Sequence, residues 1–137
     1  MIITRDQTFT VVCNIRTPID SSTEKVGTGI FISKNNKAYL VTAEHVAKET
    51  TLKSYIVYCD TSSNPTIRNL TILNPSLNWK YHPVADICCL EIDSSNNSDL
   101  LKERCFPYNH IETDISSFFQ CIIYLISWND SITYNIR

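Results

Sequence analysis

The sequence predicts an all-β fold built from short antiparallel strands. About six runs of alternating or continuously apolar residues are separated by polar and proline-containing turns, and no stretch has the pattern of a long amphipathic helix. At 137 residues, the chain is long enough for one domain with its own core and too short for two complete domains of ordinary size. Together, these features are typical of an antiparallel β-barrel or a β-sandwich.

The predicted strands, in chain order, cover residues 8–16, 30–32, 38–41, 55–59, 67–73 and 85–92. Each of them carries Val, Ile, Leu, Tyr or Phe in an alternating or continuous apolar pattern. The second and third form a hairpin around the polar turn Lys34–Lys37. A brief helical turn follows Thr42, and an irregular connection over residues 74–83 precedes the last of the six strands.

Gly27 and Gly29 are the only glycines in the chain, and both precede the hairpin strand at 30–32. A residue without a Cβ atom permits a β-bulge or the close approach of another backbone. We therefore expect a bulge or a backbone contact at the mouth of this hairpin.

Two residues outside the predicted strands carry chemistry. His45 follows an apolar strand on a short helical turn, so it is held rigidly at the edge of the core. Asp86 stands at the entrance of the apolar run 87–92, where an unpaired carboxylate would be costly and would need a hydrogen-bond donor or a cation. Taken singly, His45 could equally be a solvent-facing residue at a helix start, and Asp86 a turn or capping residue.

Three segments in order resemble the N-terminal half of the trypsin-like (chymotrypsin-fold) serine peptidases: Gly27–Ile32, Tyr39–Val46 and His82–Leu90. They match that family's glycine-flanked strand, its L-T-A-x-H histidine motif and its D-[IL]-A-type aspartate motif. The resemblance implies two six-stranded antiparallel Greek-key barrels with the catalytic groups in the cleft between them. Residues 1–107 would be the first barrel, and residues 108–137 a linker and the first strand or strands of an incomplete second barrel.

The resemblance also implies an activity, the hydrolysis of a peptide or protein substrate without a cofactor or a metal ion. His45 would be the general base and Asp86 the carboxylate that orients it. The family's nucleophilic serine lies in a glycine-rich segment, and this chain has no glycine after Gly29. The chain is therefore expected to be a fragment that lacks the serine half and is inactive by itself. Cys105 and Cys121 lack flanking glycines too and are interpreted as structural.

Two other interpretations stay open. The chain could be a non-catalytic binding or scaffold module derived from the peptidase fold. It could also be a small β-barrel unrelated to peptidases, in which His45 and Asp86 lie far apart. The distance between these two side chains separates the last interpretation from the others.

Composition limits the binding partners and the cellular compartment that we expect for this protein. A net charge of −2 gives no electrostatic reason to expect a nucleic acid or an anionic membrane. No stretch approaches the roughly 20 apolar residues of a membrane helix, and no signal-peptide pattern is seen, so we expect a cytoplasmic protein, or a secreted one if the start is incomplete. The cysteines, six in number, lie mostly in apolar runs and are expected to be buried free thiols, while His82 and His110 are expected to be a surface and a linker residue.

Residues 118–126 are strongly apolar and are predicted to form a strand of the incomplete second barrel. An exposed strand of this kind would promote aggregation. We expect it to pack against the first barrel or to self-associate with another chain.

Overall fold

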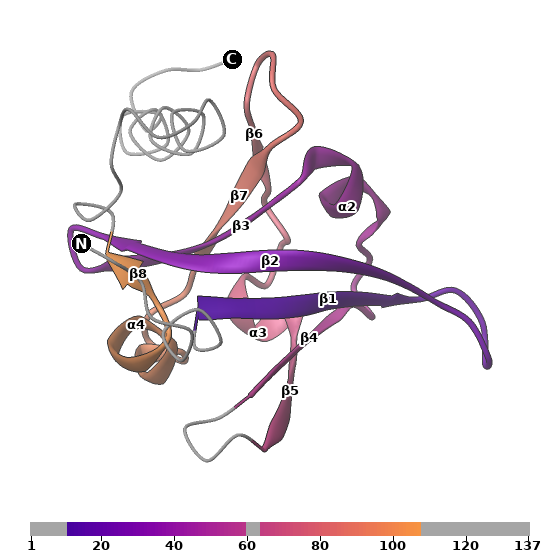
Figure 1. Cartoon of the computed structure of the whole chain (residues 1–137), viewed down its shortest axis with the longest axis horizontal. Coiled ribbons are helices and arrows are strands. Elements are labelled where there is room, and N and C mark those ends of the chain that lie inside the picture. Colours follow the sequence, from indigo (N-terminus) through magenta and orange to yellow (C-terminus); the bar gives the residue numbers. More distant parts are fainter. Residues whose placement is uncertain (1–10, 60–63, 108–137) are drawn as a thin grey trace.

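The computed structural model describes residues 11–59 and 64–107 (Figure 1). Its elements, in order, are β1 (Val12–Pro18), β2 (Glu24–Lys34), β3 (Lys37–Thr42), α2 (Glu44–Glu49), β4 (Tyr55–Cys59), β5 (Pro65–Asn69), α3 (Leu70–Leu73), β6 (Lys80–Tyr81), β7 (Cys88–Ile92), α4 (Ser98–Glu103) and β8 (Phe106–Pro107). The predicted all-β class is confirmed, since strands dominate within residues 11–59 and 64–107 and the helices described there have at most six residues. The expectations for 108–137, including His110 and Cys121, lie outside the described residues.

One mostly antiparallel sheet runs in the order β5-β4-β1-β2-β3-β7-β6, and β8 pairs in parallel with β2. The core cluster takes side chains from β4 and β7, near opposite ends of this order, so the sheet curls around a single core (Figure 1). No ladder joins β5 to β6 among the described strands. The six-stranded Greek-key barrel is therefore not confirmed.

The β2–β3 hairpin forms as predicted, and Asn35 and Asn36 adopt positive φ angles of 52° and 64° in its turn. Asparagine tolerates this left-handed region, and two consecutive positive φ angles match the right-handed twist of the flanking strands. The expectation of a bulge or backbone contact at the glycines is wrong. Strand β2 begins at Glu24 and contains both glycines, which are paired regularly with β1 and crowded by side chains.

The predicted strand 67–73 is wrong in its second half, because β5 ends at Asn69 and α3 begins at Leu70. In this single helical turn, Leu70 and Leu73 are three residues apart and therefore share one side, and both are fully buried in the core. The strand predicted to begin at 85 begins at Cys88 instead, and α4 was not anticipated.

The described cysteines are free, and Cys13, Cys88 and Cys89 are buried as expected, whereas Cys59 is exposed and Cys105 half-buried. Burial raises the pKa of the Cys13 thiol to about 12 and also raises the pKa of the Cys88 thiol. These thiols are protonated at neutral pH and serve as small apolar core residues.

Candidate active site

Strands β2, β3 and β7 are neighbours in the sheet, and β3 leads directly into helix α2. Strand β3 ends at Thr42, whose buried hydroxyl Oγ1 donates a 2.7 Å hydrogen bond to the carbonyl oxygen of Thr28 in β2. From β7, the thiol of Cys88 lies 3.6 Å from the carbonyl oxygen of Thr42. The start of α2 is therefore anchored to the buried part of the sheet.

Helix α2 begins after Ala43, which has no side chain that could cap the helix. The first backbone N–H groups of a helix lack partners within the helix. Asp86, in the loop between β6 and β7, supplies an acceptor for one of these groups. Its Oδ1 accepts a hydrogen bond from the backbone N–H of His45 at 3.0 Å. A carboxylate from 41 residues away thus caps this helix.

The same carboxylate holds the imidazole ring. Asp86 Oδ2 lies 2.7 Å from His45 Nδ1. An ionised carboxylate only accepts hydrogen bonds, so Nδ1 must carry the proton, and the lone pair of the neutral ring is then on Nε2. Two contacts from one carboxylate set both the position and the tautomer of His45. The alternative in which His45 and Asp86 lie far apart is contradicted by this distance.

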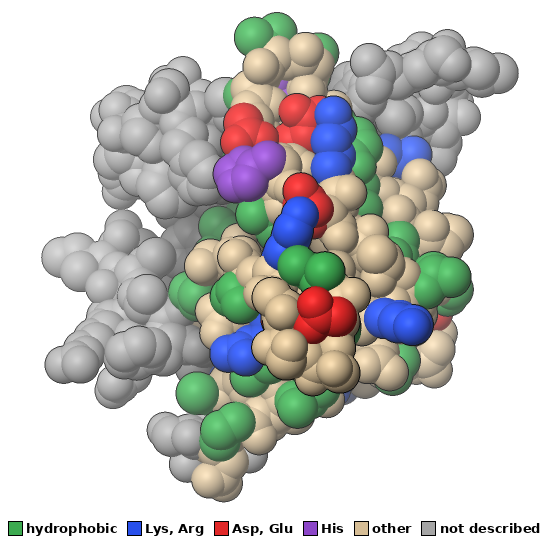
Figure 2. All heavy atoms as spheres, turned by 90° about the vertical axis from the view of Figure 1, so that its right-hand side faces the viewer, with side chains coloured by type: hydrophobic (Ala, Val, Ile, Leu, Met, Phe, Trp, Pro, Cys, Tyr) green, Lys and Arg blue, Asp and Glu red, His purple; other side chains and the backbone are tan. Residues whose placement is uncertain are grey.

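The pKa of the Asp86 carboxyl is lowered, first by its hydrogen bond with the His45 ring and next by the hydrogen bond from the His45 backbone N–H. Both donors favour the ionised form. Asp86 finds the hydrogen-bond donor that was expected for it at the entrance of the apolar run, but the site is not buried, because the side chains of His45 and Asp86 are 75% and 56% exposed. The loop carrying Asp86 turns at the surface before β7 becomes buried, so the pair faces solvent. Figure 2 shows a histidine at the surface beside acidic side chains.

His82 shapes the loop that carries Asp86. Its ring atom Nδ1 accepts hydrogen bonds from the backbone N–H groups of Val84 at 3.1 Å and Ala85 at 2.9 Å. The backbone N–H of His82 donates to the carbonyl oxygen of Ile87 at 2.9 Å. The expected role as a plain surface residue is therefore incomplete, since the ring is half-buried and organises the turn. His82 lies two residues before Val84 and three before Ala85. In Asx turns, too, a side chain accepts a hydrogen bond from a backbone N–H about two residues later, so this spacing is visible in the sequence.

A cavity of about 380 Å³ adjoins the candidate pair, with His45 among its lining residues. Ile15, Val26 and Val46 supply apolar surface, and the ion pair between Lys25 and Glu49 closes part of its rim. The exposed Val26 is 59% accessible. The cavity can therefore take a small apolar group next to the imidazole.

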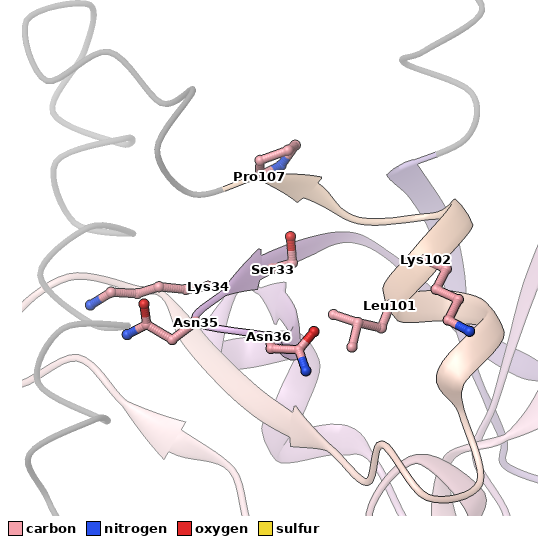
Figure 3. Close-up of a pocket in the computed structure, with 7 residues that line it drawn as sticks. All are labelled: Ser33, Lys34, Asn35, Asn36, Leu101, Lys102 and Pro107. Carbon is pink, nitrogen blue, oxygen red and sulfur yellow. The ribbon is translucent and has the colours of Figure 1, made fainter.

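A second cavity, of about 520 Å³, lies between the β2–β3 turn and the end of α4 (Figure 3). Its lining includes Lys34 and Lys102, but Figure 3 shows their ammonium groups at opposite ends of the view. None of the described residues that line it is a His, Asp, Glu or Cys. Its described lining shares no residue with the cavity beside His45.

Within residues 11–59 and 64–107, no hydroxyl or thiol is hydrogen-bonded to the His45 ring. The same residues contain no group of three or more His, Cys, Asp or Glu side chains that could hold a metal ion. None of the helices formed by these residues has the length and apolar character needed to cross a membrane.

Comparison of the chain with family models, with curated proteins and with solved structures gave no match.

Proposed function

We propose that this chain carries the general-base half of a trypsin-like serine peptidase, with His45 as the base and Asp86 as its orienting carboxylate. The observation that supports the proposal most directly is the double contact of Asp86, through Oδ2 with the ring Nδ1 and through Oδ1 with the backbone N–H of His45. The order of the three sequence segments and the curled antiparallel sheet agree with it. The six-stranded Greek-key barrel is part of this proposal.

The chemistry follows from the position of the protons. Nδ1–H is held by Asp86, so Nε2 can accept the proton of an attacking serine hydroxyl as the new bond to the substrate carbonyl forms. The ionised Asp86 then stabilises the imidazolium. The imidazolium returns its proton to the leaving amine, which completes acyl transfer to the serine, and water releases the acyl group in a second step.

The nucleophile and the oxyanion-binding amides would belong to a further segment of the protein. The pair is mostly exposed in this chain, so a second structural unit could cover it and exclude water. A peptide or protein substrate would run past His45, with one apolar side chain in the adjoining cavity of about 380 Å³. The 137-residue chain itself is proposed to be inactive.

A binding or scaffold module is the second candidate. The observation in its favour is the same exposure, 75% for His45 and 56% for Asp86, together with the absence of glycine after Gly29. In that case, the apolar cavity would hold a side chain of a bound peptide, and the pair would act as a remote cap for α2.

The two candidates are separated by the coding DNA beyond the codon for Arg137, read in all three frames. The peptidase proposal expects a Gly-[Asp/Asn]-Ser-Gly-Gly segment within about 100 further residues, the length of one more barrel. The corresponding longer product should react with a fluorophosphonate probe, and His45→Ala should abolish the reaction. Lys48→Ala, an exposed change on the same helix, is the control and should leave it intact.

A stop codon with no such segment in any frame would reject the peptidase proposal in favour of the binding module. So would a longer product whose labelling survives His45→Ala. Labelling of the 137-residue chain by the same probe would contradict the statement that it is inactive.

A further inference from the structure

The strands β2, β3 and β7 have a second apolar face, on the side of the sheet opposite the core. Side chains alternate along a strand, so Phe31, Leu40 and Leu90 point into the core cluster while their neighbours point the other way. This outer face consists of Ile30, Ile32, Tyr39, Val41 and Cys89. Its members adjoin across the strands, because Ile32 pairs with Tyr39, and Val41 pairs with both Ile30 and Cys89.

Four of the five members of the outer face are as deeply buried as the core, and Ile30 is half-buried. Ile32 and Val41 are 1% exposed, and Tyr39 and Cys89 are 0% exposed. An antiparallel sheet with one face in water would alternate apolar with polar residues, and these strands do not. The face has a polar border at the ion pair between Lys37 and Glu91, both exposed. The four buried side chains are therefore covered by another part of the chain.

The described helices do not supply this cover. Ala47 of α2, Leu70 and Leu73 of α3, and Leu100 of α4 all belong to the core cluster on the other side of the sheet. Gly27 confirms the side for α2, since a Cβ atom there would lie 2.5 Å from the Val46 side chain, and Gly27 shares its face of β2 with Phe31. Among the described residues, the helices therefore leave the outer face uncovered.

We propose that the apolar segment 118–126 of this chain covers the outer face. The last described residue, Pro107, pairs with Ser33 of β2, and Figure 3 shows the two close together. The preceding residue, Phe106, pairs with Ile32 of the outer face, so the chain leaves the described region next to this face. The ten residues 108–117 can span up to roughly 33 Å. That reach exceeds the approximately 10 Å across three neighbouring strands.

The composition of the segment matches the face. Residues 118–126 read Phe-Phe-Gln-Cys-Ile-Ile-Tyr-Leu-Ile, with a single polar side chain and no charge. Residues 1–10, the other large segment outside the described regions, contain Arg5, Asp6 and Gln7 in their middle and offer fewer apolar side chains. Burial of apolar surface is the main favourable term in such packing, so the uncharged segment is the better cover. This inference does not depend on the proposed peptidase function.

Photo-crosslinking of the full chain tests the contact. Benzoylphenylalanine would replace Ile30, a half-buried member of the outer face, and the crosslinked peptides would be identified by mass spectrometry. We expect a crosslink within one chain to the peptide containing residues 118–126. The same amino acid at Ile67, an isoleucine of β5 that is 66% exposed, is the control and should not capture this peptide. Capture of residues 1–10, capture of a second copy of the chain, or no capture of 118–126 would each overturn the proposal.

Thiol protection gives a second measurement. Adjacent residues point to different sides in any regular structure, so charging both Ile122 and Ile123 places a carboxylate against the face. In Ile122→Asp/Ile123→Asp, we expect native-state alkylation of Cys89 to accelerate about tenfold or more, with Cys88 on the core face still protected. The matched control is Asn129→Asp/Asn135→Asp, which adds the same charge outside the segment and should leave Cys89 protected. An unchanged Cys89 would overturn the proposal, and if both thiols react because the variant unfolds, the crosslink decides.

Discussion

Two carboxylates in this protein each accept two hydrogen bonds from one distant partner, yet their surroundings differ. Asp99 of α4 receives the Arg68 guanidinium at 3.1 and 2.7 Å, and Asp86 receives His45 at 3.0 and 2.7 Å. The Arg68 side chain is 18% exposed, whereas the His45 side chain is 75% exposed. Arg68 also donates to Asn97 at 3.0 Å and lies over the ring of Tyr58, with 5.7 Å between guanidinium carbon and ring centroid.

The difference separates a structural pair from a chemically available one. The partners of Arg68 are the Asp99 carboxylate, the Asn97 side-chain amide and the Tyr58 ring. The pair therefore ties β5 to α4 and leaves little room for another ligand. Among the described residues, Asp86 is the one side chain bonded to His45, and most of the His45 side chain faces solvent. Exposed pairs add little to stability, so the His45–Asp86 pair should contribute less to the fold than the Arg68–Asp99 pair.

The largest expected effect comes from breaking the structural pair. Arg68→Ala would leave Asn97, Asp99 and Tyr58 without their shared partner, and we expect a loss of about 3 kcal/mol in the free energy of unfolding, measured by urea denaturation. Asp86→Asn should shift the urea midpoint much less. Arg68→Lys keeps the charge but loses the two-pronged contact, so it should fall between wild type and Arg68→Ala. Equal midpoint shifts for Arg68→Ala and Asp86→Asn would contradict the division into a structural and an available pair.

The two glycines of β2 sharpen the comparison. At Gly29, a Cβ atom would lie 2.7 Å from Leu40 Cδ1 and 3.1 Å from Ile15 Cδ1 in the core, so Gly29→Ala should cost about 2 kcal/mol in urea denaturation. At Gly27, the three nearest atoms to an added Cβ all belong to Val46 of α2, beside His45. We expect Gly27→Ala to cost less and to shift the NMR signals of His45.

Val46→Ala makes room for the new methyl group and supplies the control. In Gly27→Ala/Val46→Ala, the His45 signals should return toward those of Val46→Ala alone. If Gly27→Ala leaves the His45 signals unchanged, the close contact does not position the helix.

The smallest effect is on titration. Removing the ring in His45→Ala should raise the pKa of the Asp86 carboxyl toward its ordinary value, because the main hydrogen bond that favours its ionised form is lost. Carboxyl carbon NMR would measure the change, and the pKa of Asp99, lowered by Arg68, should stay put as the internal control. A folded-state pKa below the unfolded one stabilises the fold fully above the unfolded pKa and loses that contribution as pH falls through the folded pKa. In His45→Ala, the loss of folding stability at acid pH that is due to Asp86 should therefore be smaller than in the wild type.

Local features of the fold were readable from residues alone. The two asparagines and their flanking lysines predict the β2–β3 turn, and the apolar patterns at 8–16 and 55–59 predict two of the strands. These features depend on the period of a strand and on backbone preferences, which act over a few residues. The short helix carrying His45 was predictable in the same way.

Only the tertiary structure decided the features that join distant segments. Leu70 and Leu73 become a helical turn because the core receives both of them, although their sequence reads as a strand. His45 and Asp86 meet because the antiparallel register of β3 and β7 pairs Thr42 with Cys88, which places the residues flanking that pair side by side. The exposure of the pair and the burial of the outer face depend on which segments cover the sheet. Such coverage depends on side-chain contacts across dozens of residues, and no local pattern in the chain specifies it.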